Sequence, residues 1–170
     1  MPASTVHSSP RRRGYSLIEM LITILIIQII STMVVVNVSS VTAGEKAQRA
    51  AEQLIYATRY ARMLAMTSGT TAGVEFDTAS NTVRVFTGST FTTAANSMFT
   101  NNQYSFDYDT HNDFAGTRII GAQLSAQSTN PYRVTYGTLG GTNNNGFVTI
   151  QYGTVQKTVS IPLVGEAKIQ

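Results

Sequence analysis

A single carboxylate stands near the start of a long uncharged stretch of this chain. Glu19 follows the run Arg11-Arg12-Arg13-Gly14-Tyr15 closely, and the next charged residue is Glu45. An ionised carboxylate within hydrocarbon costs on the order of 3 kcal/mol, so a glutamate in such a segment needs a cation or a place at the polar edge of the membrane. Glu19 is therefore either a residue at headgroup level or one half of an ion pair.

A second set of chemically active side chains alternates along residues 106–113. On a strand, Asp107, Asp109, His111 and Asp113 would share one face, and clustered carboxylates are typical calcium ligands. The same pattern is typical of a solvated acidic edge that discourages strand pairing. A lone histidine in a loop does not indicate a hydrolytic triad. The sequence predicts no catalytic residue and no cofactor, and leaves the three aspartates as metal candidates.

The uncharged stretch is long enough to cross a membrane. Residues 20–38 are almost wholly apolar, and a bilayer core of about 30 Å needs roughly 20 such residues in a helix. Three arginines and no acid precede the stretch, which places the N-terminus inside and the rest of the chain outside. We expect a membrane span over residues 15–38. An ordinary secretory signal would be cut after its apolar core, near residues 39–43, and would leave Gly14 and Glu19 without a role.

The charge balance gives no support to nucleic-acid binding. The net charge of +3 comes from Arg11–Arg13, since the other nine basic side chains match nine acidic ones. Phosphate recognition needs a basic patch, whereas Arg84, Arg118 and Arg133 are scattered over separate predicted strands and would have to converge in space. The chain has no cysteine, so disulfides and thiolate metal sites are excluded.

The residues after Gly44 indicate a second helical segment. Small and apolar residues recur there at spacings of three and four, the period of an amphipathic helix. Because Ser68-Gly69 ends this pattern, we expect one long helix from Tyr15 to about Thr67. The face expected to be buried is formed by Ala47, Ala50, Ala51, Leu54, Ala57, Thr58, Ala61, Leu64 and Ala65.

Beyond Gly69 the hydrophobic period changes from 3.6 to 2, which is typical of strands. Two alternating segments around Thr78-Ala79-Ser80-Asn81 predict a hairpin, and the Thr- and Asn-rich stretch from Thr87 to Gln103 predicts a surface loop. Three later segments predict a meander that Pro162 ends. The predicted fold is α+β, a long N-terminal helix packed on an antiparallel head. Its expected strands are 72–77, 82–86, 104–108, 117–124, 132–136, 147–152, 155–161 and a short one within 164–169.

The N-terminal motif resembles the signal of the type IV prepilins. That signal is a basic leader ending in glycine, before an apolar helix with a glutamate near its start, as in Arg11-Arg12-Arg13-Gly14-Tyr15-Ser16-Leu17-Ile18-Glu19. The resemblance implies cleavage by a prepilin peptidase between Gly14 and Tyr15 and methylation of the new amino group on Tyr15. It also implies a salt bridge from Glu19 to the N-terminal amine of a neighbouring subunit. Tyr15 and Ser16 replace the family's usual phenylalanine and threonine.

The order of the head elements narrows the resemblance. A helix, a hairpin, a variable loop and C-terminal strands are similar to the H-type minor pseudopilins of type II secretion and to related minor pilins of type IV pilus assembly. The closer match runs through residues 61–76 and 147–165. It implies a non-enzymatic pseudopilus subunit. The alternatives are a minor pilin that primes a type IV or DNA-uptake pilus, and a membrane-anchored β domain outside any filament.

Four segments make up the expected chain: a leader peptide over 1–14, a transmembrane helix over 15–38, its amphipathic continuation over 39–68 and a periplasmic head over 69–170. The implied partners are other pilins or pseudopilins through the N-terminal helix, the prepilin peptidase and methylase, and the inner-membrane assembly platform. The implied location is the inner membrane, with the N-terminus cytoplasmic, followed by incorporation into a filament. No nucleic-acid partner is expected.

Overall fold

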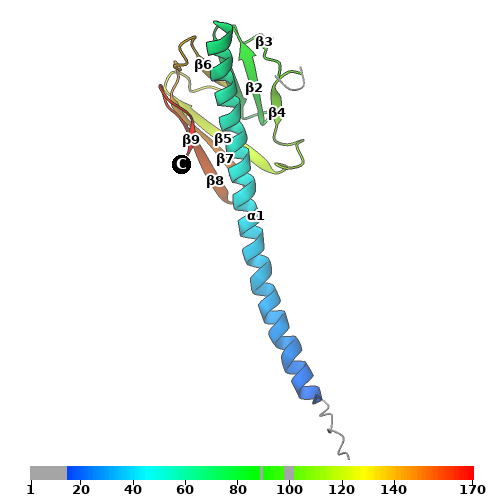
Figure 1. The fold of residues 1–170 in the computed structure, drawn as a ribbon. Coiled ribbons are helices and arrows are strands. Elements are labelled where there is room, and N and C mark those ends of the chain that lie inside the picture. The colour runs from blue at the N-terminus through cyan, green and yellow to red at the C-terminus, as the bar shows by residue number, and fades with distance from the viewer. Residues whose placement is uncertain (1–14, 89, 98–101) are drawn as a thin grey trace, which may run out of the picture. The chain divides into compact units, whose positions relative to one another are not determined.

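The computed structural model describes residues 15–88, 90–97 and 102–170, and the side chains of residues 32–41 are not described. The chain forms two compact units, Met1–Ser39 and Ser40–Gln170. One helix, α1 (Leu17–Ser68), supplies the described part of the first unit, apart from Tyr15 and Ser16, and continues into the second. All strands belong to the second unit (Figure 1).

The end of α1 lies where the sequence predicts it. The helix ends at Ser68, and Gly69 follows with φ +66°, a left-handed conformation that glycine adopts without steric cost. The hydroxyls of Thr67 and Ser68 donate to the carbonyl oxygens of Met63 and Leu64, which satisfies acceptors of the last turn. Local sequence alone is enough to end this helix.

The predicted apolar face of α1 is confirmed. Its alanines, Leu54 and Thr58 are buried in the second unit, and Leu64 is partly buried against the same core. Alanine carries no side chain beyond Cβ, so this face lets strands approach the helix closely. The fully buried Tyr108 fills the space and donates its hydroxyl to the carbonyl oxygen of Ala50 at 2.9 Å. Burial raises the pKa of the Tyr108 hydroxyl well above its usual range.

The strands form two antiparallel sheets against the second unit's part of α1 (Figure 1). The first sheet has the order β3-β2-β1-β6, and β4 also pairs with β2; the second has the order β5-β7-β8-β9. The strands are β1 (Ala72–Asp77), β2 (Thr82–Thr87), β3 (Thr93–Ala94), β4 (Ser105–Asp107), β5 (Thr117–Leu124), β6 (Tyr132–Tyr136), β7 (Gly146–Tyr152), β8 (Val155–Ile161) and β9 (Lys168–Ile169).

The hairpin β1–β2 and the end of β8 before Pro162 are confirmed, but the predicted meander is wrong. β6 does not pair with β7; it pairs with β1 in the first sheet, whereas β7 pairs with β5 and β8. Alternation of apolar residues shows that a strand has one buried face, and it does not say which strand lies beside it. The chain changes sheets in the glycine-containing turn between Tyr136 and Gly146.

The predicted loop from Thr87 to Gln103 is also corrected in part. β3 pairs with the end of β2, and Asn96 forms an isolated bridge with Gln103, so the described part of this segment extends the first sheet. A short edge strand of two residues carries too little periodicity to stand out in the sequence.

Gly73 leaves room for an aromatic ring on the first sheet. A Cβ atom at Gly73 would lie 2.4 Å from the ring of Phe86 and 2.4 Å from the carbonyl oxygen of Val134. Phe86 is directly opposite Gly73 in the β1–β2 register. The glycine therefore allows Phe86 to cover the sheet face that points away from the buried Val74 and Phe76.

Candidate functional site

The residues of the predicted cleavage site lie mostly outside the described part of the chain. Arg11, Arg12, Arg13 and Gly14 are not described, and Tyr15 is the first described residue, with 77% of its surface exposed. Cleavage after Gly14 and methylation of Tyr15 therefore stay predictions. The described part of the motif begins at Tyr15 and includes Glu19.

Glu19 lies in the first turn of α1 and is exposed. The backbone N–H groups of Glu19 and Met20 donate to the carbonyl oxygen of Ser16 at 3.0 and 3.2 Å. Ser16 and Glu19 have the spacing of a capping box, and a carboxylate is favoured at the positive end of the helix dipole. The spacing of Ser16 and Glu19 is therefore compatible with a local capping role for Glu19 at the start of the helix.

The start of α1 presents an apolar surface. The large apolar side chains between Leu17 and Ile30 are 48–79% exposed. The hydroxyls of Thr23 and Ser31 donate to the helix's own carbonyl oxygens, at Met20 and Ile27, and so do not make this surface more polar. A helix that is apolar on all faces is suited to burial by other molecules.

Within the described residues, no helix combines the length and the apolar character that crossing a membrane requires. The span predicted over 15–38 includes residues 32–38, whose side chains lie outside the described set, and it stays a prediction.

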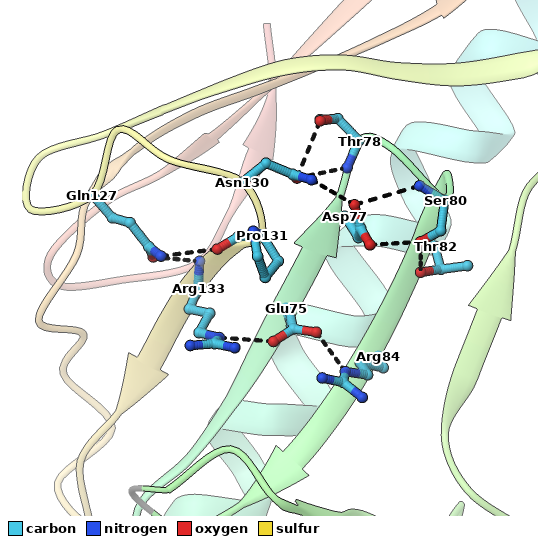
Figure 2. A network of polar contacts seen from close by, with 10 residues as sticks. All are labelled: Glu75, Asp77, Thr78, Ser80, Thr82, Arg84, Gln127, Asn130, Pro131 and Arg133. Atoms are coloured by element: carbon cyan, nitrogen blue, oxygen red, sulfur yellow. Dashed lines mark hydrogen bonds and ion pairs between the residues drawn. The ribbon is translucent and has the colours of Figure 1, made fainter.

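A charged cluster lies on the first sheet, on the face away from Val74 and Phe76 (Figure 2). Glu75, on the central strand β1, is directly opposite Arg84 of β2 and Arg133 of β6. Arg84 donates through Nε to Oε1 at 2.5 Å, and Arg133 donates through Nε to Oε2 at 2.7 Å. Burial alone would raise the pKa of Glu75, but the two guanidinium groups outweigh it, so the pKa lies below its ordinary value.

Asp77 organises the turn between β1 and β2 in the same view (Figure 2). Its carboxylate accepts hydrogen bonds from the Asn130 side chain at 2.7 Å and from the Ser80 hydroxyl at 2.8 Å. It also accepts from the backbone N–H of Ala79. Because these donors favour the ionised form, they lower the pKa of Asp77 to about 2.

Three amide side chains cover the outer edge of β6. Gln127 Oε1 accepts from the N–H of Arg133, and Asn144 Nδ2 donates to the carbonyl oxygen of Arg133. Asn143 accepts through Oδ1 from Thr135, and its N–H donates to the carbonyl oxygen of Thr135. An edge strand left open is a template for pairing with another chain, so this covering limits association through β6.

The metal candidates are not assembled into a site. β4 ends at Asp107, and the chain then turns, so the four side chains do not share a strand face. Asp107 accepts from the N–H of Asp109, Asp109 accepts from Asn81, and His111 and Asp113 lie 3.9 Å apart. Among the described residues, no three His, Asp or Glu side chains are placed to hold a metal ion.

The three scattered arginines do not form one basic patch. Arg84 and Arg133 converge on Glu75, which neutralises one of their two charges, and Arg118 is exposed on β5 in the other sheet. The sequence reading missed Glu75 and the amides at positions 81, 127, 143 and 144. Glu75 and Asn81 bond residues on other strands, and the amides at 127, 143 and 144 bond β6 from the loops on either side of it. The path of the chain, rather than a residue pattern, brings these groups together.

Comparisons with known proteins match two separate features of the chain. Residues 9–35 match the prokaryotic N-terminal methylation motif. No curated protein matches the chain.

Two solved structures share the fold. The minor pseudopilin EpsH from the Type 2 Secretion System of Vibrio cholerae is 12% identical, with a TM-score of 0.53 over 74% of this chain and 96% of that one. The type IV minor pilin FimU of Pseudomonas aeruginosa is 17% identical, with a TM-score of 0.54 over 74% of this chain and 89% of that one. At such identities the likeness establishes the fold alone. The chain thus joins the prokaryotic N-terminal methylation motif to a type IV pilin-like α+β fold.

Proposed function

We propose that this chain is a minor pseudopilin, a non-enzymatic structural subunit of the pseudopilus of a type II secretion system. One observation carries the proposal: a methylation motif over residues 9–35 includes the start of α1, and the rest of α1 and the head have the pilin-like fold. The similarity to the minor pseudopilin EpsH supports the choice of the secretion pseudopilus.

The N-terminal part of α1 is the proposed assembly element. Its apolar side chains are exposed from Leu17 to Ile30, which suits packing among the helices of neighbouring subunits. Prepilin peptidase would cut after Gly14 and the new amino group on Tyr15 would be methylated. Glu19 would then pair with the amine of a neighbouring subunit. Before assembly the chain would be anchored in the inner membrane through residues 15–38, with the head in the periplasm.

Processing can be tested by intact-mass spectrometry of the membrane-associated protein from cells with and without a prepilin peptidase. We expect the peptidase to remove residues 1–14 and the mature form to gain one methyl group. Gly14→Leu should stay at the precursor mass. Gly44→Leu is a matched control, because a Cβ atom at Gly44 meets no neighbour within 4 Å. An intact Met1 in all samples, or a mature form that begins near Ala43, would contradict the proposal.

A minor pilin of a type IV pilus is the second candidate, favoured by the equal fold similarity to FimU. The two can be separated by crosslinking the mature protein in its own cells. The secretion pseudopilus is supported if the protein crosslinks to secretion pseudopilins and if a deletion strain loses secretion. Recovery of pilins with loss of surface pili supports the second. A processed protein that crosslinks to neither would indicate a membrane-anchored β domain outside any filament.

A further inference from the structure

The cluster of Glu75, Arg84 and Arg133 has a net charge of +1, because one carboxylate faces two guanidinium groups. The side chain of Glu75 is only 5% exposed, whereas Arg84 and Arg133 are 43% and 33% exposed. Each arginine bonds Glu75 through Nε, and within the described residues no acceptor receives a hydrogen bond from their Nη atoms. The terminal nitrogens of both guanidinium groups therefore remain available as donors.

Arg133 also borders a cavity of about 380 Å³. Phe91, Gln127, Thr135, Asn143 and Asn144 line it together with Arg133. These side chains come from four different segments of the chain, and all of them belong to the second unit.

The N–H groups of this cavity that have no partner among the described residues lie on Asn143 and Arg133. Gln127 Oε1 and Asn143 Oδ1 already accept from Arg133 and Thr135. Asn144 uses both ends of its amide, donating to Arg133 and accepting from Ala126. Asn143 Nδ2 and the Arg133 Nη atoms have no hydrogen-bond partner among the described residues. A ligand that brings acceptors can therefore pair with these N–H groups.

Phe91 covers the cavity beside the guanidinium group. Its ring centre lies 4.4 Å from Arg133 Cζ and 4.5 Å from the ring centre of Phe86. Phe91 has φ +58°, a left-handed conformation that is rare for a bulky side chain and that clusters at binding sites. A ring this close covers part of the guanidinium group, and reduced hydration strengthens its attraction for an anion.

We propose that the cavity formed by Phe91, Arg133 and Asn143 binds a carboxylate presented by an acidic side chain of a partner protein. A planar carboxylate matches the parallel donors of a guanidinium group. The single excess charge of the cluster fits a monoanion. The amides that cover the outer edge of β6 prevent that edge from pairing with another backbone. A partner that contacts β6 therefore meets the sheet face that carries Arg133.

The proposal is tested by titrating an acetyl-Gly-Glu-Gly-amide peptide into the full-length processed chain in detergent. Calorimetry measures the binding, and the NMR signals of the arginine Nε–H groups report where the peptide binds. We expect saturable binding that weakens with salt, and no binding of the peptide with Gln in place of Glu. Sodium acetate is the probe for a free carboxylate. Tighter binding of the peptide than of acetate supports a protein side chain as the ligand.

Four variants make the test specific. Arg133→Gln should weaken binding at least about tenfold, since a charge-assisted hydrogen bond is lost. Phe91→Leu, which leaves the Glu75 pair untouched, should weaken it several-fold. Glu75→Gln should strengthen it, because the cluster then carries two uncompensated charges. Arg118→Gln removes the same charge from an exposed site on the other sheet and should change nothing.

Three results would overturn carboxylate binding at this cavity. One is the absence of saturable binding to the folded wild-type chain. Another is equal weakening by Arg118→Gln and Arg133→Gln, which would mean unspecific charge attraction. The third is weaker binding in Glu75→Gln, which would mean that Arg133 serves only to neutralise Glu75. Equal affinity for acetate and the peptide would overturn the assignment to a partner protein.

Discussion

The side chain of Asn81, in the turn between β1 and β2, pairs with the backbone of Ile119 on β5 in the other sheet. The N–H of Ile119 donates to Asn81 Oδ1 at 2.9 Å, and Asn81 Nδ2 donates to the carbonyl oxygen of Thr117 at 2.7 Å. The same nitrogen reaches Asp109 at 2.8 Å. One amide therefore acts as a strand partner for the edge of β5, and it ties the two sheets together near Tyr108.

Replacing Asn81 with Ala should destabilise the fold by roughly 2–4 kcal/mol, because buried backbone groups of β5 lose their partners. Asn81 has φ 55°, which alanine tolerates less well than asparagine. Asn81→Gly separates the two effects, since glycine accepts this conformation without the amide. Urea unfolding followed by circular dichroism measures the loss. Exposed Asn112→Ala is the control, and a stable Asn81→Gly protein would show that the amide contributes little.

Removing the Glu75 side chain should leave two arginines without their shared partner. Loss of one member of a buried ion pair typically costs 3–5 kcal/mol, and we expect about 2 kcal/mol for Glu75→Ala because Arg84 and Arg133 remain partly exposed. The free energy of unfolding in urea checks this value. The double variant Glu75→Ala/Arg84→Ala, which has the same net charge as the wild type, should recover part of the lost free energy of unfolding. No recovery in the double variant would show that the charges act independently.

Acid should destabilise the head as the pH falls from about 4 to about 2. Hydrogen bonds from Asn130 and Ser80 lower the pKa of Asp77 to about 2 in the folded state. Its ionised form therefore stabilises the fold at pH values above the pKa that Asp77 has in the unfolded chain. This contribution is lost as the carboxylate takes up its proton. Unfolding measured at a series of pH values should show the decline, and Asn130→Ala should make it shallower. An unchanged slope in that variant would contradict the assignment.

Glu19 has two proposed roles that different substitutions separate. A capping box accepts glutamine in place of glutamate, whereas an ion pair with an amine requires charge. We expect Glu19→Gln and Glu19→Val both to be cleaved normally and both to fail to co-assemble, as read by crosslinking to other subunits. Normal assembly of Glu19→Gln with failure of Glu19→Val would assign the residue to helix capping instead.

Features that depend on residues close together in the sequence were determined by the sequence alone. The end of α1 at Ser68, the buried alanine face, the β1–β2 hairpin and the end of β8 before Pro162 all follow from local spacing and from residues with restricted backbones. The N-terminal motif was equally readable, since its residues are contiguous. The spacing of apolar residues and the positions of glycine and proline indicate which face of a segment is buried and where the segment ends. They do not indicate which other segment lies beside it.

Only the tertiary structure decided which strands lie side by side and which polar groups meet. β6 joins β1 rather than β7, and this choice alone brings Arg133 to Glu75 and forms the cavity under Phe91. Asn81 reaches β5 because the two sheets close on the same helix. Aspartates that alternate in the sequence are separated because β4 ends at Asp107. A hydrogen bond between distant segments is set by the path of the whole chain, so no local pattern encodes it.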